Sequence, residues 1–498
     1  MSLSWPCRCR RVTAWAVLLS HQASGMSIPR HLLPNGSYLH PSSSIVNLGD
    51  TERGIKVVDE SGIPANEVLL SVPMENIITP AKGRNTPAGK ALEKNGVQVS
   101  DKTYLALWIC DAVGGERAEG SSDEAGSPYC YHETLPPLDS LRHLPLFWSD
   151  SDLGELEGSM VRSQTLSKRN ELASTYDTII GACAPFGLQV SLETFFWANA
   201  CVDSRMFHLR EEYNETQSTG QDIGLVPMAD MLNHRSRSDP ASCDWKVEKQ
   251  PGGGKAFVTR TSPTGLGSGD EAWCSYGLHP NGHYLGQYGF SLEDNRRHDG
   301  ACPDEAHVTA IVTGSDGQPI YKMFDLSIGN VDDAKGMLSA LRVHVGTDEE
   351  KQKNLNCSSN TTDATRQPKF PLPICSTNER AVISHLKQSV ETALGRYKTS
   401  LGQDLALLAL DKDSGGAEAT KSLALGSIRR NAVLIRSGEK HVLGHWLFVC
   451  NAAMSLLNDV EKGIATWECY CEVLATTLTR KESIAPPPGK APAPTLPA

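Results

Sequence analysis

The sequence feature that most constrains the fold is a central stretch, residues 224–290, in which isolated polar side chains stand among apolar ones. It begins Gly-Leu-Val-Pro-Met-Ala-Asp-Met-Leu-Asn-His and ends Gln-Tyr-Gly-Phe, with a second cluster, Trp-Cys-Ser-Tyr-Gly, at residues 273–277. The polar residues in question are Asp230, Asn233, His234, Tyr276 and Tyr288. Polar groups in apolar surroundings are the informative exceptions to the usual burial pattern. We therefore interpret this stretch as the floor of an active site.

The composition indicates a soluble globular protein of two or three domains. The chain has 498 residues, of which 39% are hydrophobic and 21% charged, and this length allows a sizeable core. The formal net charge of -11 argues against a nucleic-acid binder that relies on bulk positive charge. An acidic surface favours basic partners instead, such as a protein that presents a lysine.

The cysteines and histidines do not predict a disulfide framework or a metal site. The 14 cysteines are scattered along the chain, and the C-x-C pairs at residues 7–9 and 469–471 lack the further Cys or His of a zinc site. Asp230, Asn233 and His234, even with Asp239, His279 and His283 downstream, have irregular spacing and include an Asn. We expect no bound metal and a reducing compartment.

The N-terminus has the composition of a targeting segment. The first 49 residues contain no Asp or Glu but several arginines and many serines, which is typical of an organellar transit peptide. A secretory signal with an apolar core at residues 14–19 and a plain disordered tail are the alternatives. The apolar residues 442–457 are too short for a membrane span and contain His445 and Asn451, so they predict a buried helix. The expected location is intracellular, in a plastid or mitochondrion after import, or otherwise in the cytoplasm or nucleus.

Strands are expected on both sides of a helical region. Order is expected from about Ile45, with strands at residues 52–58 and 68–73. Gly54 either lets the backbone approach a ligand or only makes a turn. Residues 79–205 are predicted to be mainly helical, including helices at 103–113 and 192–202, with Ser191 as the N-cap of the latter. Trp148, between these helices, is predicted to be a core residue.

The chain beyond residue 250 changes from strands to helices. Residues 256–260 and 271–276 are predicted strands. The run Gly-Gly-Gly-Lys at 252–255 lacks the spacing of a phosphate loop and the Ser or Thr after Lys, so a hairpin turn is predicted. Apolar residues at helical spacing then predict an all-helical second domain: these are Ile383, Leu386, Val390, Leu394, Tyr397, Leu401, Leu443, Trp446, Cys450, Ala453 and Leu457. A surface loop is expected at 351–377 and a disordered tail after residue 484.

Three segments of the central stretch resemble the SET domain of protein lysine methyltransferases, and most closely its Rubisco large-subunit methyltransferase-like branch. They read Val-Pro-Met-Ala-Asp-Met-Leu-Asn-His at 226–234, Ser-Tyr-Gly at 275–277 and Tyr-Gly-Phe at 288–290. Four further segments are similar to elements of that branch: residues 52–55 to its N-terminal cofactor loop, 145–158 to its helical insert, 204–207 to its Ser-Arg-x-Phe element, and 427–443 to its substrate-binding domain. The order of these motifs along residues 45–470 makes the resemblance specific.

The resemblance implies an α+β fold, in which a β-rich pseudoknotted SET domain with a helical insert is followed by an all-helical C-terminal domain. The implied domains are a disordered or targeting segment at 1–44, the N-terminal part of the SET domain at 45–80, its helical insert at 81–203, its C-terminal part at 204–295, a helical substrate-binding domain at 306–470 and a disordered tail at 484–498. In this fold the last SET segment threads a preceding loop, so that residues over fifty positions apart share one pocket.

The resemblance also implies the activity and the site. It indicates an S-adenosylmethionine-dependent protein-lysine N-methyltransferase that acts on a non-histone protein, as a monomer, without nucleic-acid or membrane partners. The implied cofactor-binding residues are Glu52, Arg53, Gly54, Arg205, Asp230, Asn233, His234 and Tyr276. Tyr276 is also the catalytic residue, and Phe207 and Tyr288 are expected to line the lysine channel.

Methyl transfer from a sulfonium is an in-line displacement, so alignment of the reacting groups supplies much of the rate enhancement. The lysine must attack as a neutral amine, although its reference pKa is about 10.4. Burial in an aromatic channel beside the cationic sulfonium would depress that pKa. A tyrosine hydroxyl can then orient the amine, and Tyr276 fits this role.

Two other functions remain open at this point. One is a histidine methyltransferase, because one branch of the same fold modifies actin and has smaller polar groups in place of the channel aromatics; the aromatic Phe207 and Tyr288 favour lysine. The other is a non-enzymatic adaptor, against which the intact Tyr276, Asn233 and His234 argue. The sequence departs from the branch at 278–283, Leu-His-Pro-Asn-Gly-His, where Ser-Asn followed by Ala or Glu is common. This departure is expected to affect the helix start and the substrate channel more than the cofactor pocket.

Overall fold

The structure is a computed structural model of the chain. It describes residues 34–48, 53–114, 128–183, 190–209, 222–235, 239, 242–296, 302–314, 317–350, 372–413 and 426–480. Two compact units are present: the first comprises Met1–Ser140 and Leu172–Leu278, and the second Leu141–Glu171 and His279–Ala498. Residues 1–33 of the predicted targeting segment, most of the 351–377 loop and the tail after residue 484 lie outside the described residues.

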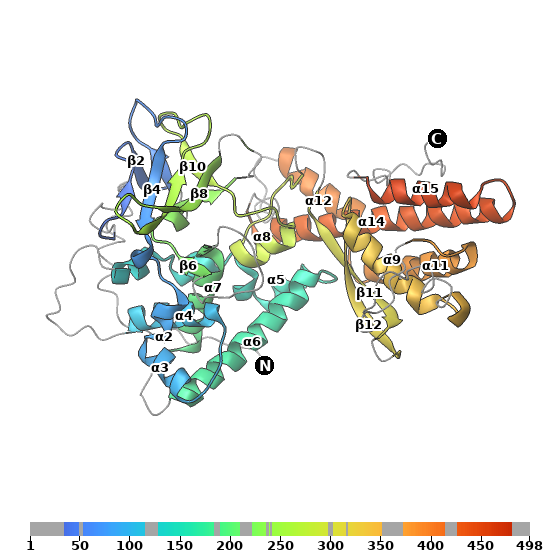
Figure 1. Ribbon diagram of the computed structural model, residues 1–498, viewed down its shortest axis with the longest axis horizontal. Coiled ribbons are helices and arrows are strands. Elements are labelled where there is room, and N and C mark those ends of the chain that lie inside the picture. The colour runs from blue at the N-terminus through green and yellow to red at the C-terminus, as the bar shows by residue number, and fades with distance from the viewer. Residues whose placement is uncertain are drawn as a thin grey trace. The chain divides into compact units, whose positions relative to one another are not determined.

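An eight-stranded sheet forms one side of the first unit, and helices lie next to it (Figure 1). Its order is β1 (Tyr38–Leu39), β4 (Val68–Pro73), β9 (Lys255–Arg260), β8 (Ser242–Lys249), β10 (Glu271–Cys274), β3 (Arg53–Val57) and β2 (Ser43–Asn47), with β7 (Asn233–His234) paired to β10. Most neighbours are antiparallel, but β10 runs parallel to both β7 and β8. Strands from the beginning and the end of the unit therefore lie side by side.

The predicted strands of the first unit are confirmed. Residues 68–73 form β4, and the expected strands at 52–58, 256–260 and 271–276 correspond to β3, β9 and β10. The run at 252–254 is a hairpin turn, as predicted: β8 and β9 pair antiparallel, and the amide of Gln250 donates to the Gly254 carbonyl at 2.8 Å. The sheet buries apolar side chains from strands that are far apart in the sequence, such as Ile55, Leu70 and Phe257, in one core.

Helices and short turns complete the first unit. They are η2 (Met74–Asn76), α2 (Pro80–Arg84), α3 (Pro87–Lys94), α4 (Asp101–Gly114), η3 (Pro128–Thr134), η4 (Leu138–Leu141), α7 (Leu192–Arg205) and η7 (Ala229–Met231), with a two-stranded sheet of β5 (Met206–His208) and β6 (Ile223–Leu225). The predicted helices at 103–113 and 192–202 correspond to α4 and α7. Ser191 caps α7 as predicted, because its side chain accepts from the Thr194 amide.

The second unit is mainly helical (Figure 1). Its elements are η5 (Pro145–Phe147), α5 (Asp150–Gly154), α8 (Asn281–Tyr288), β11 (Glu305–Thr313), β12 (Pro319–Ser327), α9 (Val331–Val345), α11 (Ser376–Leu394), α12 (Leu401–Asp413), α14 (Ile428–Glu461) and α15 (Trp467–Leu478), and α6 (Met160–Cys183) contributes residues to both units. The core includes Leu386 of α11 with Leu443 and Leu457 of α14. Trp148 is 3% exposed, which confirms its predicted place in a core.

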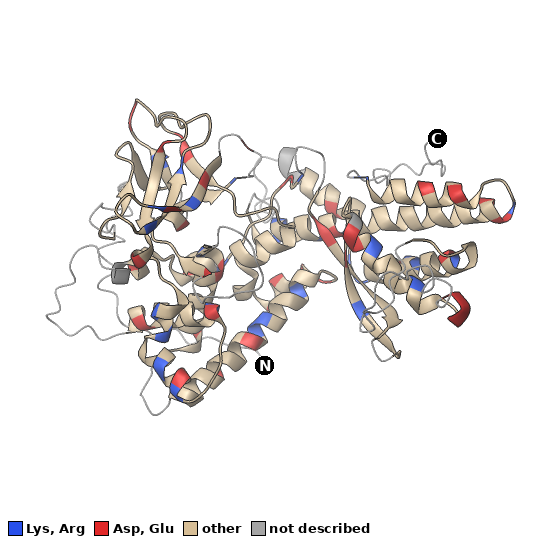
Figure 2. Cartoon of the chain, in the orientation of Figure 1, with Lys and Arg blue, Asp and Glu red and all other residues tan. Residues whose placement is uncertain are grey.

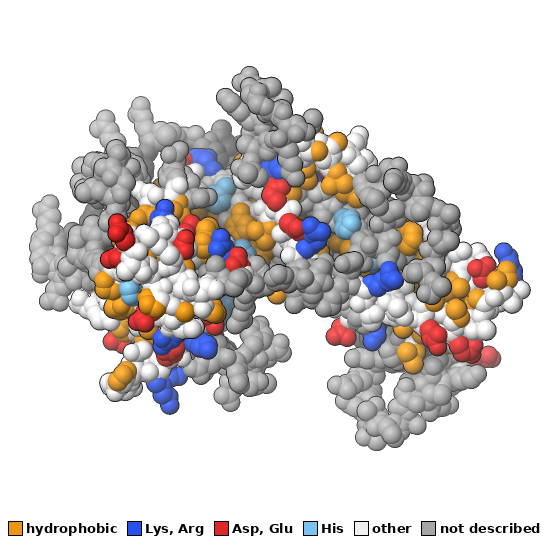
Figure 3. All heavy atoms as spheres, turned by 90° about the horizontal axis from the view of Figure 1, so that it is seen from above, with side chains coloured by type: hydrophobic (Ala, Val, Ile, Leu, Met, Phe, Trp, Pro, Cys, Tyr) orange, Lys and Arg blue, Asp and Glu red, His pale blue; other side chains and the backbone are white. Residues whose placement is uncertain are grey.

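Helix α14 carries its charges unevenly. Charged residues of both signs lie between Arg429 and Lys440, whereas residues 441–458 contain no Lys, Arg, Asp or Glu (Figure 2). This uncharged part includes the predicted buried helix at 442–457, whose Val442, Leu443 and Leu457 are buried. Among the described helices, none has the length and apolar character needed to cross a membrane. On the face drawn in Figure 3, described acidic and basic side chains are interspersed, so neither sign collects in one patch.

The expectation of an all-helical C-terminal domain is corrected at residues 305–327. Here β11 and β12 pair antiparallel over nine residues each. Ala306, Val308, Ala310 and Val312 alternate with less buried residues along β11 and face the core, which is the period of a strand. Most of β12 is exposed, so only one strand of the hairpin has a clear alternation in the sequence. The rest of the region is helical, as expected.

Candidate active site

Three side chains from distant parts of the first unit surround Asp230, in η7: Arg205 and Tyr131 bond to it directly, and Arg53 acts on it through its charge. The Asp230 carboxylate is fully buried and pairs with Arg205, the last residue of α7, at 3.0 Å. The same Arg205 nitrogen also donates to the Asp230 carbonyl at 3.0 Å. The hydroxyl of Tyr131, in η3, donates to Asp230 Oδ2 at 2.9 Å. Arg53, at the start of β3, donates to the Thr134 carbonyl at 2.5 Å. Two predicted site residues, Arg205 and Asp230, are thus directly bonded.

This cluster contains more positive than negative charge. Burial and, next in size, the charge of the nearby Arg205 lower the pKa of Arg53, and its net value is about 10. Burial disfavours the charged form of Arg205, but Asp230, Tyr131 and Cys201 together outweigh burial, so the pKa of Arg205 is raised. Because of burial and the adjacent Asp230 charge, the pKa of Tyr131 lies well above its ordinary value. Two guanidinium groups therefore share one carboxylate in a setting of low polarity.

Two atoms of the cluster have no hydrogen-bond partner among the described residues: Arg205 Nε and Asp230 Oδ1. Buried polar groups in native proteins nearly always have partners. Because the ion pair of Arg205 and Asp230 retains one unpartnered donor and one unpartnered acceptor, a polar ligand can form hydrogen bonds with both residues. Met228, which precedes η7, has a φ of 69°. Such a backbone conformation is strained in a residue other than Gly, and strain of this kind is concentrated at functional sites.

Asn233 and His234 form β7, which is held against β10. Trp273 is the partner of Asn233 in this parallel pairing, and Cys274 the partner of His234. The Asn233 amide donates to the Arg53 carbonyl at 3.0 Å and to Glu271 Oε1 at 2.8 Å. The Asn233 side chain therefore links β3 to β10, and the hydrogen bonds to these two strands fix its position.

Gly54 serves packing in the sheet. It lies in β3, opposite Val46 of β2, and so it does not make the turn that the sequence left open. A Cβ atom at this position would lie 2.6 Å from Leu48 Cδ1 and 2.7 Å from Glu271 Oε1. The absence of a side chain thus makes room for the carboxylate that holds Asn233. The preceding Glu52, also predicted to bind the cofactor, lies outside the described residues.

Tyr276 is fixed at both its backbone and its side chain. Its amide donates to His234 Nδ1 at 3.1 Å, and its hydroxyl donates to the Leu232 carbonyl at 2.9 Å. The Tyr276 and His234 rings lie 5.2 Å apart between centroids. A hydroxyl that donates its proton to a carbonyl can still accept hydrogen bonds through its oxygen. Tyr276 is thus an oriented acceptor, positioned by the segment that carries Asn233 and His234.

Phe207 belongs to an aromatic cluster of three rings. Its ring centroid lies 5.7 Å from that of Trp245 in β8 and 5.0 Å from that of Phe257 in β9, both edge to face. Trp245 and Phe257 stack at 4.8 Å. Offset and edge-to-face contacts of this kind are favourable and directional. The neighbours therefore fix the orientation of the Phe207 ring.

Tyr288 lies in the second unit, at the C-terminal end of α8. Its ring is 6.1 Å from Phe290 and 6.4 Å from Tyr284 between centroids. Its expected role in the lysine channel stays a prediction.

At residues 278–283, where the sequence departs from the branch pattern, α8 begins at Asn281 directly after Pro280, and the His279 and His283 rings stack at 4.0 Å. Pro280 thus marks the start of the helix without interrupting it.

The structure brings together Arg53, Gly54, Arg205, Asp230, Asn233, His234 and Tyr276 through direct contacts or shared partners. Sequence reasoning missed Tyr131, Glu271 and Trp245, which hold Asp230, Asn233 and Phe207. Trp245 is an aromatic residue in a strand and offered a weak signal. Tyr131 and Glu271 act through single long-range hydrogen bonds, for which the sequence has no pattern. Among the described residues, no group of His, Cys, Asp and Glu is arranged to hold a metal ion.

Comparison with solved structures identifies the fold. The chain matches the SET domain of LSMT bound to methyl-lysine and AdoHcy with a TM-score of 0.63 and 21% identity, over 86% of this chain and 91% of that one. It matches Rubisco LSMT bound to AdoMet with a TM-score of 0.60 and 18% identity, over 89% and 92%. The protein therefore has the SET fold, and the expected fold class is confirmed.

The family comparison places the chain more narrowly. Residues 314–443 match the family described as Rubisco LSMT substrate-binding. The chain is 24% identical to the chloroplastic Rubisco large-subunit N-methyltransferase of Nicotiana tabacum over 80% of its length and 76% of the relative's. It is also 24% identical to the chloroplastic fructose-bisphosphate aldolase-lysine N-methyltransferase of Arabidopsis thaliana, over 78% and 76%, and 22% identical to the actin-histidine N-methyltransferase of Danio rerio, over 80% and 64%. The chain is thus homologous to Rubisco LSMT and other SET-domain methyltransferases, as the sequence motifs indicated.

Proposed function

We propose that this protein is an S-adenosylmethionine-dependent protein-lysine N-methyltransferase that acts on a non-histone protein. The observation that carries the proposal is the fixed position of Tyr276, whose hydroxyl donates to the Leu232 carbonyl at 2.9 Å. Its amide is bonded to His234, next to Asn233 in β7. Tyr276, the predicted catalytic residue, is therefore bonded to the segment that carries Asn233 and His234, two of the predicted cofactor residues. The lysine N-methyltransferases among the relatives and the cofactor-bound structures support the same activity.

The residues around Asp230 fit the proposed cofactor. S-adenosylmethionine carries a carboxylate and an amine, and the cluster offers the surplus positive charge of Arg53 and Arg205 together with the unpartnered Arg205 Nε and Asp230 Oδ1. When bound, the cofactor supplies an electrophilic methyl group on a sulfonium. Arg53, Arg205, Asp230, Asn233 and His234 are the residues proposed to hold it. Gly54 acts indirectly, by leaving space for Glu271.

The proposed role of Tyr276 is to orient the attacking amine. Its oxygen can accept a hydrogen bond while its O–H group continues to donate to the Leu232 carbonyl. An amine held in line with the methyl group reacts faster because its orientation is already established before the reaction. A low-polarity surrounding favours the neutral form of lysine that attacks. Tyr276 accordingly acts through position and needs no change in its own protonation.

Lysine is favoured over histidine as the acceptor by the aromatic cluster. Phe207 is an aromatic residue held by Trp245 and Phe257, and an aromatic wall suits the long apolar stem of lysine. Tyr288 is proposed to contact the same side chain. The relatives that modify actin histidine make histidine the principal rival. The chloroplastic relatives support the proposal that the acid-poor N-terminal segment directs import into a plastid.

The test is incubation of the purified full chain with methyl-labelled S-adenosylmethionine and a lysate of the source cells, followed by mass spectrometry of the labelled proteins. We expect label on lysine, and its loss in Tyr276→Phe with cofactor affinity retained. Tyr38→Phe, in the exposed part of β1, is the matched control and should methylate normally. Label confined to histidine would establish the rival activity. Cofactor binding without any labelled protein would support the adaptor and contradict this proposal.

A further inference from the structure

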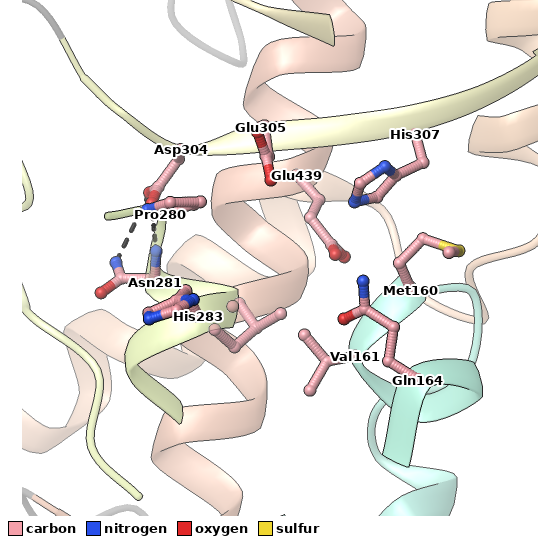
Figure 4. Close-up of a pocket in the computed structure, with 12 residues that line it drawn as sticks. Met160, Val161, Gln164, Pro280, Asn281, His283, Asp304, Glu305, His307 and Glu439 are labelled. Atoms are coloured by element: carbon pink, nitrogen blue, oxygen red, sulfur yellow. Dashed lines mark hydrogen bonds between the residues drawn. The ribbon is translucent and has the colours of Figure 1, made fainter. Parts of the chain in front are cut away.

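A polar cavity lies wholly within the second unit, beside the N-terminal end of α8. Its volume is about 130 Å³. Figure 4 shows that side chains from α6, α8, the start of β11 and α14 surround it. Asp304, Glu305 and Glu439 supply three carboxylates, and Val161 and Ile435 supply apolar wall. A cavity of this size holds far more than one water molecule.

Glu439 is the most deeply buried carboxylate of the cavity. It is 6% exposed, and each of its oxygens accepts a hydroxyl proton: Oε1 from Ser159 at 2.8 Å, and Oε2 from Tyr397 at 2.9 Å. Burial raises its pKa, and the charge of Asp304 adds to this increase, while the hydrogen bonds from the two hydroxyls lower it; the net pKa is about 7. In Figure 4 its carboxylate points into the space between β11 and α6, toward Gln164. The hydroxyls hold this carboxylate in place, and they do not neutralise it.

Asp304 and Glu305 bring further negative charge to the same wall. Asp304 Oδ1 accepts from the Asn281 amide and from the Asn295 side chain, both at 2.8 Å. A Cβ atom on Gly438 would lie 2.9 Å from Asp304 Oδ2, so glycine at this position lets α14 approach the carboxylate. Burial raises the pKa of Glu305. The glycine and the hydrogen bonds thus bring like charges together.

No Lys or Arg is among the described residues that line the cavity, and none of the three carboxylates forms an ion pair with a described Lys or Arg. The two histidines of the lining are His283 and His307, and His307 pairs with Asp325. Buried charges are normally paired, because desolvation is costly. The described side chains also contain no group arranged for a metal ion. The space, the apolar wall and the negative end together suit a long organic cation.

We propose that this cavity binds a lysine or arginine side chain of the protein substrate, distinct from the lysine that is methylated. The stem of the side chain would lie on Val161 and Ile435, and its cationic head would face Glu305 and Glu439. The inference rests on the proposed function, because it assigns the cavity to the substrate of that reaction. It agrees with the position of Ile435 and Glu439 inside the segment that matches the substrate-binding family.

The cavity also predicts where the basic residue lies in the substrate. It adjoins Asn281 and Gly282 at the start of α8, whereas Tyr288, proposed to contact the target lysine, ends the same helix. The seven steps along the helix from Asn281 to Tyr288 span roughly 10 Å at 1.5 Å per residue. An extended peptide covers that length in about three residues. The second basic residue is therefore expected about three positions from the target lysine.

The test uses fluorescent peptides with a central lysine and one variable position, moved from four residues before it to four residues after it. The variable residue is arginine or lysine in two arms, and their uncharged counterparts citrulline or acetyl-lysine in two matched arms. Affinity for the full chain is measured by fluorescence anisotropy. We expect roughly ten-fold tighter binding of a charged arm at an offset of about three, the effect of one charge-assisted contact. The residue, arginine or lysine, that binds more tightly than its uncharged counterpart by the larger factor is the side chain that the cavity accepts.

Two variants locate the effect. Glu305→Gln and Glu439→Gln should reduce the preference for the charged arm, and Glu305→Gln is the less buried change if the other variant folds poorly. Glu472→Gln, an exposed position on α15, is the control and should keep the preference. Equal binding of charged and uncharged arms, or a preference that persists in both cavity variants, overturns the proposal. A charge preference without methyl transfer would support the cavity and contradict the proposed enzymatic function.

Discussion

Tyr131 and Asp230 lie 99 residues apart in the sequence and share one hydrogen bond of 2.9 Å. Asp230 has Arg205 as its second partner, so the two donors together fix the carboxylate. The Tyr131 hydroxyl therefore also determines the orientation of the Asp230 carboxylate relative to Arg205. Tyr131 is therefore a positioning residue for the proposed cofactor site.

Replacing Tyr131 with Phe removes this donor without changing the size of the ring. The Asp230 carboxylate would keep only Arg205, and we expect a loss of about 1–3 kcal/mol in the free energy of unfolding, the usual cost of a lost buried hydrogen bond. Affinity for S-adenosylmethionine should fall more than the turnover number. Urea unfolding and calorimetric titration of the cofactor measure the two effects.

Tyr176→Phe is the matched control for this change. The Tyr176 hydroxyl donates to the Val190 carbonyl at 2.8 Å, and neither residue touches the cluster around Asp230. This variant should lower stability slightly and leave cofactor affinity unchanged. If Tyr131→Phe bound the cofactor as tightly as the wild type, Tyr131 would have no positioning role.

Contiguous motifs made part of the site predictable from the sequence. Asp230, Asn233 and His234 follow one another within five residues, and Tyr276 stands in its own short motif, so each could be named before the structure. Tyr131 and Glu271 could not, because each contributes one side-chain bond across a long sequence separation. The orientation of the Tyr276 hydroxyl toward Leu232 was also not predictable, since it depends on how β7 and β10 pair.

At the scale of elements, β3 shows how a strand can position a site without contacting a ligand. Gly54 in β3 gives the Glu271 side chain of β10 the space from which it binds Asn233. The sequence predicted the strand but left the role of its glycine open. The role of Gly54 depends on the neighbouring strand β10, because an added Cβ would clash with Glu271 of that strand. A clash between two strands cannot be predicted from the sequence of one of them.

Gly54→Ala is expected to displace Glu271 and Leu48. The added Cβ would lie 2.6 Å from Leu48 Cδ1 and 2.7 Å from Glu271 Oε1, and overpacking of this kind costs about 1–3 kcal/mol. Because Asn233 depends on Glu271, cofactor affinity should fall as well. Thermal unfolding and cofactor titration test both expectations.

Gly252→Ala provides the control for this strand variant. Gly252 lies in the turn between β8 and β9, with nothing within 4 Å of an added Cβ. It should leave cofactor affinity intact. Wild-type cofactor affinity in Gly54→Ala would contradict the link from Gly54 through Glu271 to Asn233.

Helix α14 offers a comparison of two glycines in one element. At Gly438 a Cβ would approach Asp304 Oδ2 to 2.9 Å, whereas at Gly444 nothing lies within 4 Å. Alanine is favoured over glycine in a helix by about 1 kcal/mol. We therefore expect Gly444→Ala to raise the free energy of unfolding and Gly438→Ala to lower it, because the Asp304 contact outweighs the helix preference. Urea unfolding of both variants distinguishes them, and equal effects would contradict the proposed close approach.

The elements themselves were largely predictable where their period was strong. Strands β3, β4 and β9 and helices α4, α7 and α14 follow apolar patterns that a single element can satisfy. The hairpin of β11 and β12 was missed because β12 is mostly exposed and shows little alternation. Its existence depends on pairing with β11, whose alternate residues are buried in a helical core.

At the scale of the whole molecule, Glu439 makes stability depend on pH. Its pKa rises from the ordinary 4.5 to about 7 in the folded chain, so the folded state binds this proton more tightly than the unfolded state. The corresponding stability is fully present below about pH 4.5 and is lost as the pH rises through 7. The charged or titratable groups that face Glu439 are Glu305 and His307 of β11, Asp304 directly before β11, His283 of α8, and Tyr397.

Glu439→Gln removes this proton-linked contribution while leaving those neighbours in place. The free energy of unfolding of the wild type, relative to the variant, should fall by on the order of 3 kcal/mol between pH 4.5 and pH 8. Chemical unfolding of both proteins across this range measures the difference. Glu472→Gln should show a difference from the wild type that does not change with pH. A difference between the wild type and Glu439→Gln that does not change with pH would show that the burial of Glu439 does not alter its protonation.

The order of the strands has a consequence for how the protein is made. β10 lies between β8 and β3, and it pairs with β3 through Glu271 and Lys56, more than two hundred residues apart. At a synthesis rate of about 5–20 residues per second, the hairpin of β2 and β3 waits roughly 10–40 s on the ribosome before its partner exists. An open strand edge is prone to pair with other chains during that time. A nascent chain that has not reached Glu271 therefore has a special need for chaperones, and the site around Asn233 is among the last parts of the first unit to form.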